Sequence, residues 1–302
     1  MKKFTIKSPI IAVLGALLCV MLWGTAFPLI KLGYAGFAIE QSDAGSKLLF
    51  AGFRFAFSGV LVFLFGIIKQ RRILLPKRRD LLPILLLGAV QTTLQYLFAY
   101  IGVGLTTATN TSILTGTASI ISVVLAAVFF RDDRMTVLKI LGCVVGLIGI
   151  FVVNIADFSL DAVNFLGDII VLLSAVSAAG GNIITKKITL SRDPVTVTAW
   201  QLFFGGVLLI FAGLILGGRL DLANPGGVAI LVWLSVVSAV SFLLWTALLR
   251  YHPVSKITIF TMLVPVFGTL WSWILLGESV FSAQNLISLI LIAGGIVLVN
   301  RW

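Results

Sequence analysis

The hexapeptide Gly-Ile-Phe-Val-Val-Asn at residues 149–154 closes one long apolar run of the sequence, and Gly-Ile-Val-Leu-Val-Asn at 295–300 closes another. The two copies are 146 positions apart, and the same offset aligns Asp132 with Glu278. Several such matches in one order and register indicate an internal repeat. Its predicted copies are a first five-helix repeat over residues 1–154 and a second over residues 155–302.

The amino-acid composition is typical of a membrane protein. Hydrophobic residues make up 60% of the 302 positions, charged residues make up 11%, and the mean hydropathy is +1.15. Soluble domains carry roughly 25% charged residues, so a chain this apolar needs lipid as the solvent for much of its surface. Ten apolar runs are long enough to cross a bilayer, and each must be helical because lipid cannot satisfy a free backbone amide. These runs lie at 9–33, 48–68, 81–102, 106–130, 136–154, 165–186, 195–217, 227–249, 253–276 and 282–300.

The sequence therefore predicts an all-α membrane protein with ten transmembrane helices. With a cytoplasmic N-terminus, 18 lysines and arginines lie in the inner segments and only Lys31, Lys47 and Arg219 lie outside. This bias is the positive-inside pattern, and it predicts that both termini are cytoplasmic. Because each repeat holds five spans, an odd number, the second repeat must be inverted in the membrane relative to the first. Inverted repeats are typical of secondary transporters that work by alternating access.

Several short motifs stand in order along the two halves: LWGTAFPLIK at 22–31, Arg54 in the second span, Pro265 and Gly277-Glu278 around the ninth, and GGIVLV at 294–299. In this order the chain resembles the drug/metabolite transporter superfamily in its EamA-type branch. The resemblance implies ten helices in a cytoplasmic (inner) membrane and the export or exchange of metabolites such as amino acids. The sequence differs from another branch of the same superfamily, the small multidrug transporters, which use a glutamate in the first span. Residues 9–33 contain no acidic residue.

Polar and aromatic side chains inside the apolar runs are the candidate substrate-binding residues. A polar side chain in a span must find a partner, so stripes of them should face the interior of the helix bundle. Serine and threonine often bond back to their own helix, and tryptophans often only pack, so amides are the stronger candidates. An uncharged polar cavity with aromatic walls suits zwitterionic or amphipathic molecules. The candidates are Trp23, Phe27, Gln91, Gln95, Tyr96, Asn110, Thr115, Asn182 and Trp245.

Four further residues are expected to shape the helices or to gate the pathway: Pro28, Arg54, Pro265 and Glu278. Proline at 265 stands where the first repeat has Ser119, so a helix break is expected in the second repeat only. For Arg54 the sequence favours a side chain that extends to the outer interface and fixes helix packing. The alternative is contact with an anionic group of the substrate.

Other classes of function are less well supported. The basic residues lie in clusters between apolar runs rather than on a polar face, so nucleic acid is not an expected partner. The single histidine, His252, belongs to no catalytic or metal-ligand motif, so neither an enzyme nor a cofactor or metal site is expected. The expected partners are a small-molecule substrate and the lipid bilayer, with a monomer or homodimer as the assembly. The alternatives to metabolite export are a multidrug efflux antiporter and a non-transporting membrane sensor or scaffold.

Overall fold

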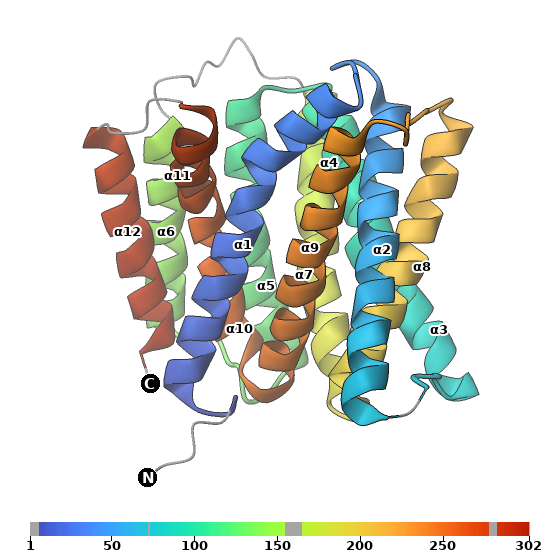
Figure 1. Ribbon diagram of the computed structural model, residues 1–302. Coiled ribbons are helices and arrows are strands. Elements are labelled where there is room, and N and C mark those ends of the chain that lie inside the picture. The colour runs from blue at the N-terminus through green and yellow to red at the C-terminus, as the bar shows by residue number, and fades with distance from the viewer. Residues whose placement is uncertain (1–5, 72, 155–164, 278–282, 302) are drawn as a thin grey trace.

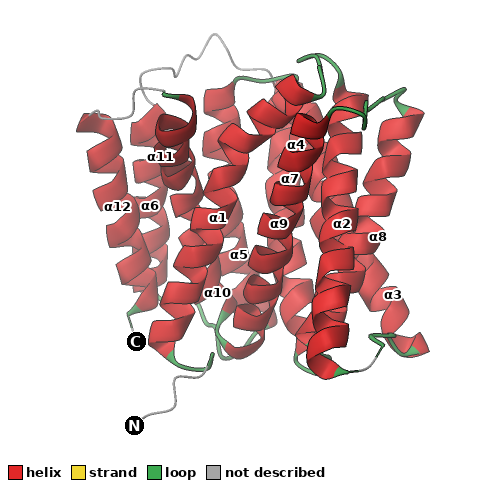
Figure 2. Cartoon of the chain, in the orientation of Figure 1, coloured by secondary structure: helices red, strands yellow, loops and turns green. Residues whose placement is uncertain are grey.

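The computed structural model describes residues 6–71, 73–154, 165–277 and 283–301, and in these residues the regular structure is helical, without strands (Figures 1 and 2). The helices stand side by side in one bundle (Figure 1). The start of the first helix and the end of the last lie together, and we call this the termini end (Figure 1). The elements are α1 (Pro9–Gly36), α2 (Ala44–Gln70), α3 (Arg78–Leu87), η1 (Gly88–Leu94), α4 (Gln95–Val103), α5 (Ala108–Phe129), α6 (Val137–Asn154), α7 (Phe165–Thr189), α8 (Pro194–Ile215), α9 (Pro225–Tyr251), α10 (Val254–Thr258), η4 (Ile259–Leu263), α11 (Val264–Leu276) and α12 (Ala283–Asn300).

The lengths and compositions of these helices confirm a helical membrane protein. Nine helices in the described part of the chain are long and apolar enough to cross a bilayer, counting Arg78–Val103 and Val254–Leu276 as continuous spans. A shorter apolar helix, Val137–Val152, occupies the fifth predicted span. Large apolar side chains such as Ile68 and Ile215 are about four-fifths exposed, at 78% and 83%, which is the surface that lipid would cover.

Glycine lines the closest helix contact of the bundle, between α2 and α8. A Cβ atom on Gly206 would lie 2.3 Å from the backbone nitrogen of Ala56, and one on Gly59 would lie 2.5 Å from that of Phe203. No side chain fits in such a gap, so the two backbones approach directly, as small residues permit in membrane helices. The α6–α12 contact is similar, because a Cβ atom on Gly142 would lie 2.6 Å from the carbonyl oxygen of Gly295.

Two of the spans are irregular in the middle. In the third, the π-helical segment η1 separates α3 from α4, and π-helical turns inside α-helices are frequent at functional sites. In the ninth, the 3₁₀ segment η4 separates α10 from α11, and Pro265 stands in the first turn of α11. The corresponding helix of the first half, α5, is continuous through Ser119. The predicted asymmetry between Pro265 and Ser119 is therefore present in the structure.

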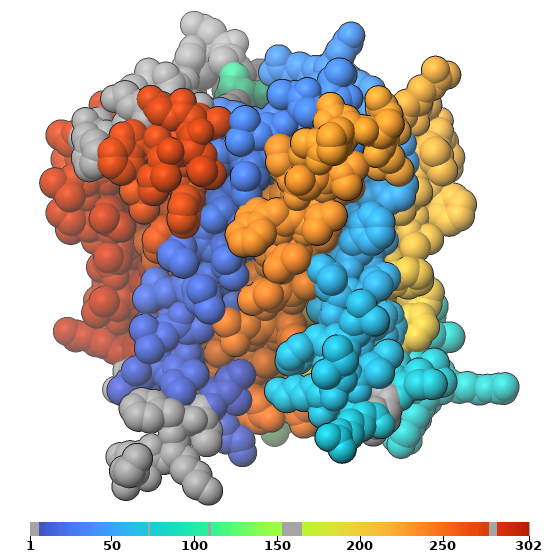
Figure 3. All heavy atoms as spheres, in the orientation of Figure 1, coloured from blue at the N-terminus to red at the C-terminus, as the bar shows by residue number. Residues whose placement is uncertain are grey.

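Helices far apart in the sequence pack against one another. α1 contacts α9 and α11, α7 contacts α4 and α5, α2 contacts α8, and α6 contacts α12. Figure 3 shows α1, α9 and α2 side by side on one face of the molecule. Every one of these contacts joins a helix of residues 1–154 to a helix of residues 165–301. The core is thus built jointly by the two halves of the chain.

Candidate functional site

A network of amide and hydroxyl side chains lies inside the bundle, and it begins at Gln91 in η1. The Oε1 atom of Gln91 accepts hydrogen bonds from the hydroxyl of Thr185 at 2.9 Å and from Nε2 of Gln201 at 3.0 Å. Its Nε2 atom donates to Oδ1 of Asn182 at 3.4 Å. Asn182 in turn donates from Nδ2 to the hydroxyl of Ser122 at 3.3 Å. These five residues, which we call the amide network, are all buried and join η1, α5, α7 and α8.

The amide network holds an indole ring in place. Nε1 of Trp245, on α9, donates to Oδ1 of Asn182 at 3.0 Å. The ring of Trp245 is 2% exposed, and its centroid lies 4.8 Å from that of Trp23 on α1 at an interplanar angle of 61°. A buried indole N–H needs an acceptor, so Asn182 sets the orientation of this ring. Two predicted amides and a predicted tryptophan therefore meet in one site.

Aromatic rings continue from Trp245 toward the third span. Trp23 lies 5.6 Å from Phe242, Phe242 lies 6.0 Å from Phe55, and Phe55 lies 4.4 Å from Tyr96, between ring centroids. We call these five rings the aromatic cluster; it draws on α1, α2, α4 and α9. The Nε1 atom of Trp23 is buried and has no hydrogen-bond partner among the described residues. The cluster thus contains an available donor beside apolar surface.

Arg54 lies next to the aromatic cluster, on α2. It is 2% exposed, and its Nε donates to the hydroxyl of Ser238 on α9 at 2.8 Å. The guanidinium carbon lies 5.1 Å from the centroid of the Phe55 ring. The side chain therefore points into the bundle. The sequence favoured the other arrangement, in which Arg54 extends to the outer interface, and the structure does not show it.

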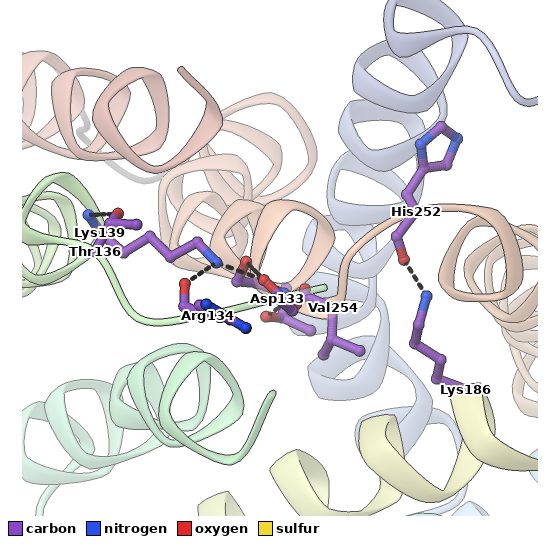
Figure 4. A network of polar contacts seen from close by, with 9 residues as sticks. Asp133, Arg134, Thr136, Lys139, Lys186, His252 and Val254 are labelled. Atoms are coloured by element: carbon purple, nitrogen blue, oxygen red, sulfur yellow. Dashed lines mark hydrogen bonds and ion pairs between the residues drawn. The ribbon is translucent and has the colours of Figure 1, made fainter. Parts of the chain in front are cut away.

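A second polar network lies at the termini end (Figure 4). The carboxylate of Asp133, in the loop between α5 and α6, is 1% exposed and accepts from the Lys139 ammonium at 2.5 Å. It also accepts from the backbone N–H of Ser255 at 2.9 Å and from the Ser255 hydroxyl. The carboxylate thus caps the first turn of α10, where the helix dipole favours negative charge. We call Asp133, Lys139 and Ser255 the Asp133 network; it ties a loop of the first half to a helix of the second.

A lysine reinforces the same end of the bundle. Nζ of Lys186, at the end of α7, donates to the carbonyl oxygens of His252 at 2.7 Å and Leu249 at 3.1 Å (Figure 4). The His252 ring in turn pairs Nε2 with the carbonyl oxygen of Ile6 at 2.8 Å. These bonds fix the ends of α7 and α9 and the entry to α1. At the termini end, the His252–Ile6 and Asp133–Ser255 bonds join the two halves of the chain.

Asn110 lies apart from the amide network. It stands in the first turn of α5, where its Nδ2 donates to both carboxylate oxygens of Asp168 at 3.4 Å. The hydroxyl of Thr106 donates to the same carboxylate at 2.5 Å. Because α5 and α7 both start at this end of the bundle, opposite the termini end, the contact ties the α4–α5 connection to α7. Asn110 thus belongs to an end-of-helix contact and not to the central site.

The remaining candidates are scattered. The hydroxyl of Thr115 donates to carbonyls of its own helix, those of Thr111 at 2.7 Å and Ser112 at 3.2 Å. Gln95 is half-buried, and among the described residues its side chain makes no hydrogen bond, although its carbonyl accepts from Ser174. Phe27 is 53% exposed and lies against Gly268 of α11. Pro28 is buried within α1, which continues through it, and Glu278 lies outside the described residues.

Several residues of these networks were not among the candidates. Gln201 could have been found, because it is the only amide in an otherwise apolar predicted span, at 195–217. Asp133 and Lys139 stand in and beside a short predicted loop, where charged residues are ordinary, so the sequence carries no signal for their burial. A surface cleft of about 500 Å³ at the termini end, between the α2–α3 connection and the start of α8, contains none of the candidates.

Comparisons with known proteins agree with this architecture. The chain is 28% identical to an uncharacterised transporter of Bacillus subtilis, YvbV, over 93% of this chain and 88% of that protein. It is also 28% identical to a probable terminal-alkyne amino-acid exporter of Streptantibioticus cattleyicolor, over 96% of this chain and 93% of that one. A solved crystal structure with 17% sequence identity matches with a TM-score of 0.80 and covers 97% of this chain and 98% of its own, so the two share a fold.

The sequence profile of the EamA-like transporter family matches the chain twice, at residues 10–155 and 165–301. The two matches together span nearly all of the 302 residues. The chain therefore belongs to the EamA-like transporter family, of the drug/metabolite transporter type, and is a multi-pass membrane transporter.

Proposed function

We propose that this transporter exports or exchanges small amphipathic metabolites, amino acids above all, by alternating access. The observation that carries the proposal is the pairing of the amide network with the aromatic cluster inside an otherwise apolar bundle. Buried polar groups in a membrane protein are costly and mark substrate pathways. Aromatic rings supply apolar contact area, and the N–H of Trp23, which has no acceptor among the described residues, supplies a donor that a polar substrate group can use.

Alternating access requires two halves that can rearrange, and we propose ten transmembrane helices arranged as two inverted repeats, at residues 1–154 and 155–302. The pattern of helix contacts supports this arrangement. Exchanging the halves turns the α1–α9 and α1–α11 contacts into the α7–α4 and α7–α5 contacts, and it leaves α2–α8 and α6–α12 unchanged. The two matches of the family profile, one in each half, support the same division.

Within this scheme the termini end is the cytoplasmic end, and the Asp133 network is a contact that must open before substrate passes there. Its members come from both halves, as a gate between rocking units requires. We propose that the protein resides in a cytoplasmic (inner) membrane, since the basic residues concentrate in the segments assigned to that side.

We propose that the protein works as a monomer or homodimer. Two pairs of glycines four residues apart, Gly142 with Gly146 and Gly213 with Gly217, permit close helix approach, either to a second copy or within one chain. Gly142 packs on α12, Gly146 packs on Met262, and Gly213 packs on Leu49 of α2. Close packing within one chain accounts for Gly142, Gly146 and Gly213 without a second copy, whereas Gly217 has a positive φ and an added Cβ atom there would meet nothing within 4 Å.

The substrate class is tested by uptake into proteoliposomes with a panel of radiolabelled amino acids and cationic drugs, with and without an imposed pH gradient. The proposal predicts uptake of a related group of amino acids, competed by unlabelled members of that group. Uptake of drugs that follows the pH gradient would replace it with a multidrug antiporter. A folded protein that carries no member of the panel would favour a sensor or scaffold.

A further inference from the structure

Arg54 is a buried cation whose charge is not neutralised by the part of the chain that the structure describes. No acidic side chain in that part lies within ion-pair distance of it. A guanidinium carries five N–H donors, and only Nε of Arg54 has a hydrogen-bond acceptor among the described residues, the Ser238 hydroxyl. A charge inside the membrane without a partner is strongly unfavourable, so an arginine held this way needs a further role.

The surroundings of Arg54 are rich in phenolic hydroxyls. The Phe55 ring contacts the guanidinium on one hand and the Tyr96 ring on the other, at 4.4 Å between ring centroids, and the Tyr96 and Tyr100 rings are 6.4 Å apart. The Tyr34 hydroxyl lies near that of Tyr100 but makes no well-formed hydrogen bond in the described residues. The cation and two tyrosines are thus linked through one phenyl ring, and no carboxylate among the described residues forms an ion pair with the cation. Planar guanidinium groups bind carboxylates through two parallel hydrogen bonds.

Apolar surface begins directly beside this cation. The Phe55 ring lies 5.1 Å from the guanidinium carbon, and the contacts then pass through Phe242 to Trp23. Arg54 is the eleventh residue of α2, roughly 15 Å along the helix from the end opposite the termini end. A ligand with its anionic group at Arg54 would thus place its body against the aromatic cluster, deeper in the bundle.

We infer that Arg54 is the anion-binding element of the transport site and that the substrate is a carboxylate with an apolar body. This inference rests on the proposed function, since it names the substrate class of the same site. The guanidinium Nη atoms donate to the carboxylate, the tyrosine hydroxyls supply further donors, and the aromatic cluster contacts the apolar body. In this arrangement the substrate carboxylate neutralises the buried charge and accepts from its remaining N–H donors, which accounts for an arginine in an otherwise unfavourable environment.

The test measures binding and transport separately. Binding is the shift in melting temperature of purified protein caused by benzoate or N-acetyl-L-phenylalanine, compared with the carboxylate-free benzamide and L-phenylalanine methyl ester. Transport is uptake of radiolabelled L-phenylalanine into proteoliposomes. The variants are Arg54→Gln, Arg54→Lys and, as a matched control, Arg219→Gln, which replaces an exposed arginine of the end opposite the termini end.

Charge-assisted hydrogen bonds predict that wild-type protein binds the carboxylates about ten- to a hundredfold more tightly than the analogues that lack a carboxylate. Arg54→Gln abolishes that preference while its ligand-free melting temperature stays equal to or above that of wild type. Arg54→Lys keeps part of the preference, and Arg219→Gln matches wild type.

The inference is overturned by a preference for carboxylates that survives in Arg54→Gln. It is also overturned by a ligand-free Arg54→Gln protein that is less stable and that loses binding of the carboxylates and of the carboxylate-free analogues alike. The second result would assign Arg54 to helix packing. Absence of any preference for carboxylates in wild-type protein would also overturn it. Transport failure with intact, Arg54-dependent carboxylate binding would instead contradict the proposed function and leave the binding site standing.

Discussion

Replacing Asp133 by asparagine is predicted to open the termini end of the bundle. The substitution keeps the shape of the side chain but removes the charge that accepts from the Lys139 ammonium and from Ser255. The Asp133 side chain is 0% exposed and that of Lys139 is 10% exposed, so solvent screens this pair only weakly. Breaking one partner of a buried ion pair costs about 3–5 kcal/mol, and the neutral hydrogen bonds that asparagine can still accept return about 1 kcal/mol.

The net cost of about 3 kcal/mol falls on the closed state alone if the two halves separate when this end opens. Since 1.4 kcal/mol is a factor of ten, the closed–open equilibrium shifts by about two orders of magnitude toward the open state. Ala126 is a suitable reporter, because it is 0% exposed in α5, close to the Asp133 loop, and packs in the core of the termini end. The assay is the rate of N-ethylmaleimide modification of Ala126→Cys in a chain whose native Cys19 and Cys143 are replaced by alanine.

The account predicts a graded series of labelling rates. Asp133→Asn accelerates labelling about a hundredfold, and Ser255→Ala, which removes one hydroxyl, accelerates it about fivefold. Asp80→Asn is the control at the same end. Its partner, the Arg192 side chain, is 24% exposed, and although Nε of Arg192 lies 2.8 Å from Oδ1 of Asp80, the N–H is not aligned for a hydrogen bond. That partly exposed pair is worth about 1 kcal/mol or less, so labelling stays near the wild-type rate. Equal rates in folded Asp133→Asn and Asp80→Asn proteins would refute the gating role of the Asp133 network.

Three further predictions concern the interior. Asn182→Leu leaves Trp245 and other buried partners without a hydrogen bond and lowers the melting temperature by several degrees, whereas Gln95→Leu leaves the melting temperature unchanged. Equal melting temperatures in the two variants would show that the amide network does not stabilise the core. Trp23→Phe leaves the melting temperature unchanged, because the Trp23 N–H has no partner in the described residues, but it weakens substrate binding about fivefold in a titration. An unaltered affinity would exclude a hydrogen bond from this indole to the substrate. Gly206→Ala prevents the close approach of α2 and α8, so the variant gives no monodisperse peak in size-exclusion chromatography. Gly294→Ala keeps that peak, because the added methyl group meets nothing within 4 Å. A monodisperse peak from Gly206→Ala would contradict the packing of α2 against α8.

The spans could be predicted from the sequence because a bilayer imposes a length and a polarity on every helix. The break between the third and fourth spans, predicted at residues 102–106, lies between the end of α4 at Val103 and the start of α5 at Ala108. The break near Pro265 also followed from the sequence, since proline cannot donate a helical hydrogen bond.

The site was harder to predict, because side-chain partners depend on tertiary contacts. Gln91 and Gln95 are both candidates from the sequence, four residues apart, but Gln91 lies in the π-helical η1, where residues four apart do not share a face as they do in an α-helix. Asn110 was grouped with the central amides by residue type alone. Its actual partner, Asp168, is 58 positions away, and no local pattern connects the two.

The burial of Arg54 shows a further limit of sequence patterns. A long basic side chain in a span can extend to the interface or turn inward, and hydropathy does not distinguish the two. Only the contact with Ser238, 184 positions away, establishes the inward orientation.

The central claim, transport by alternating access, is tested most directly by counterflow. Proteoliposomes preloaded with unlabelled L-leucine or L-phenylalanine are diluted into a trace of the same labelled amino acid, with Asn182→Leu vesicles and protein-free vesicles as controls. The account predicts a transient accumulation of label above its equilibrium level in the wild-type vesicles, because a carrier exchanges one molecule for another. Label that rises only to equilibrium, at the same rate in loaded and unloaded vesicles, would indicate a channel-like pathway and contradict the account.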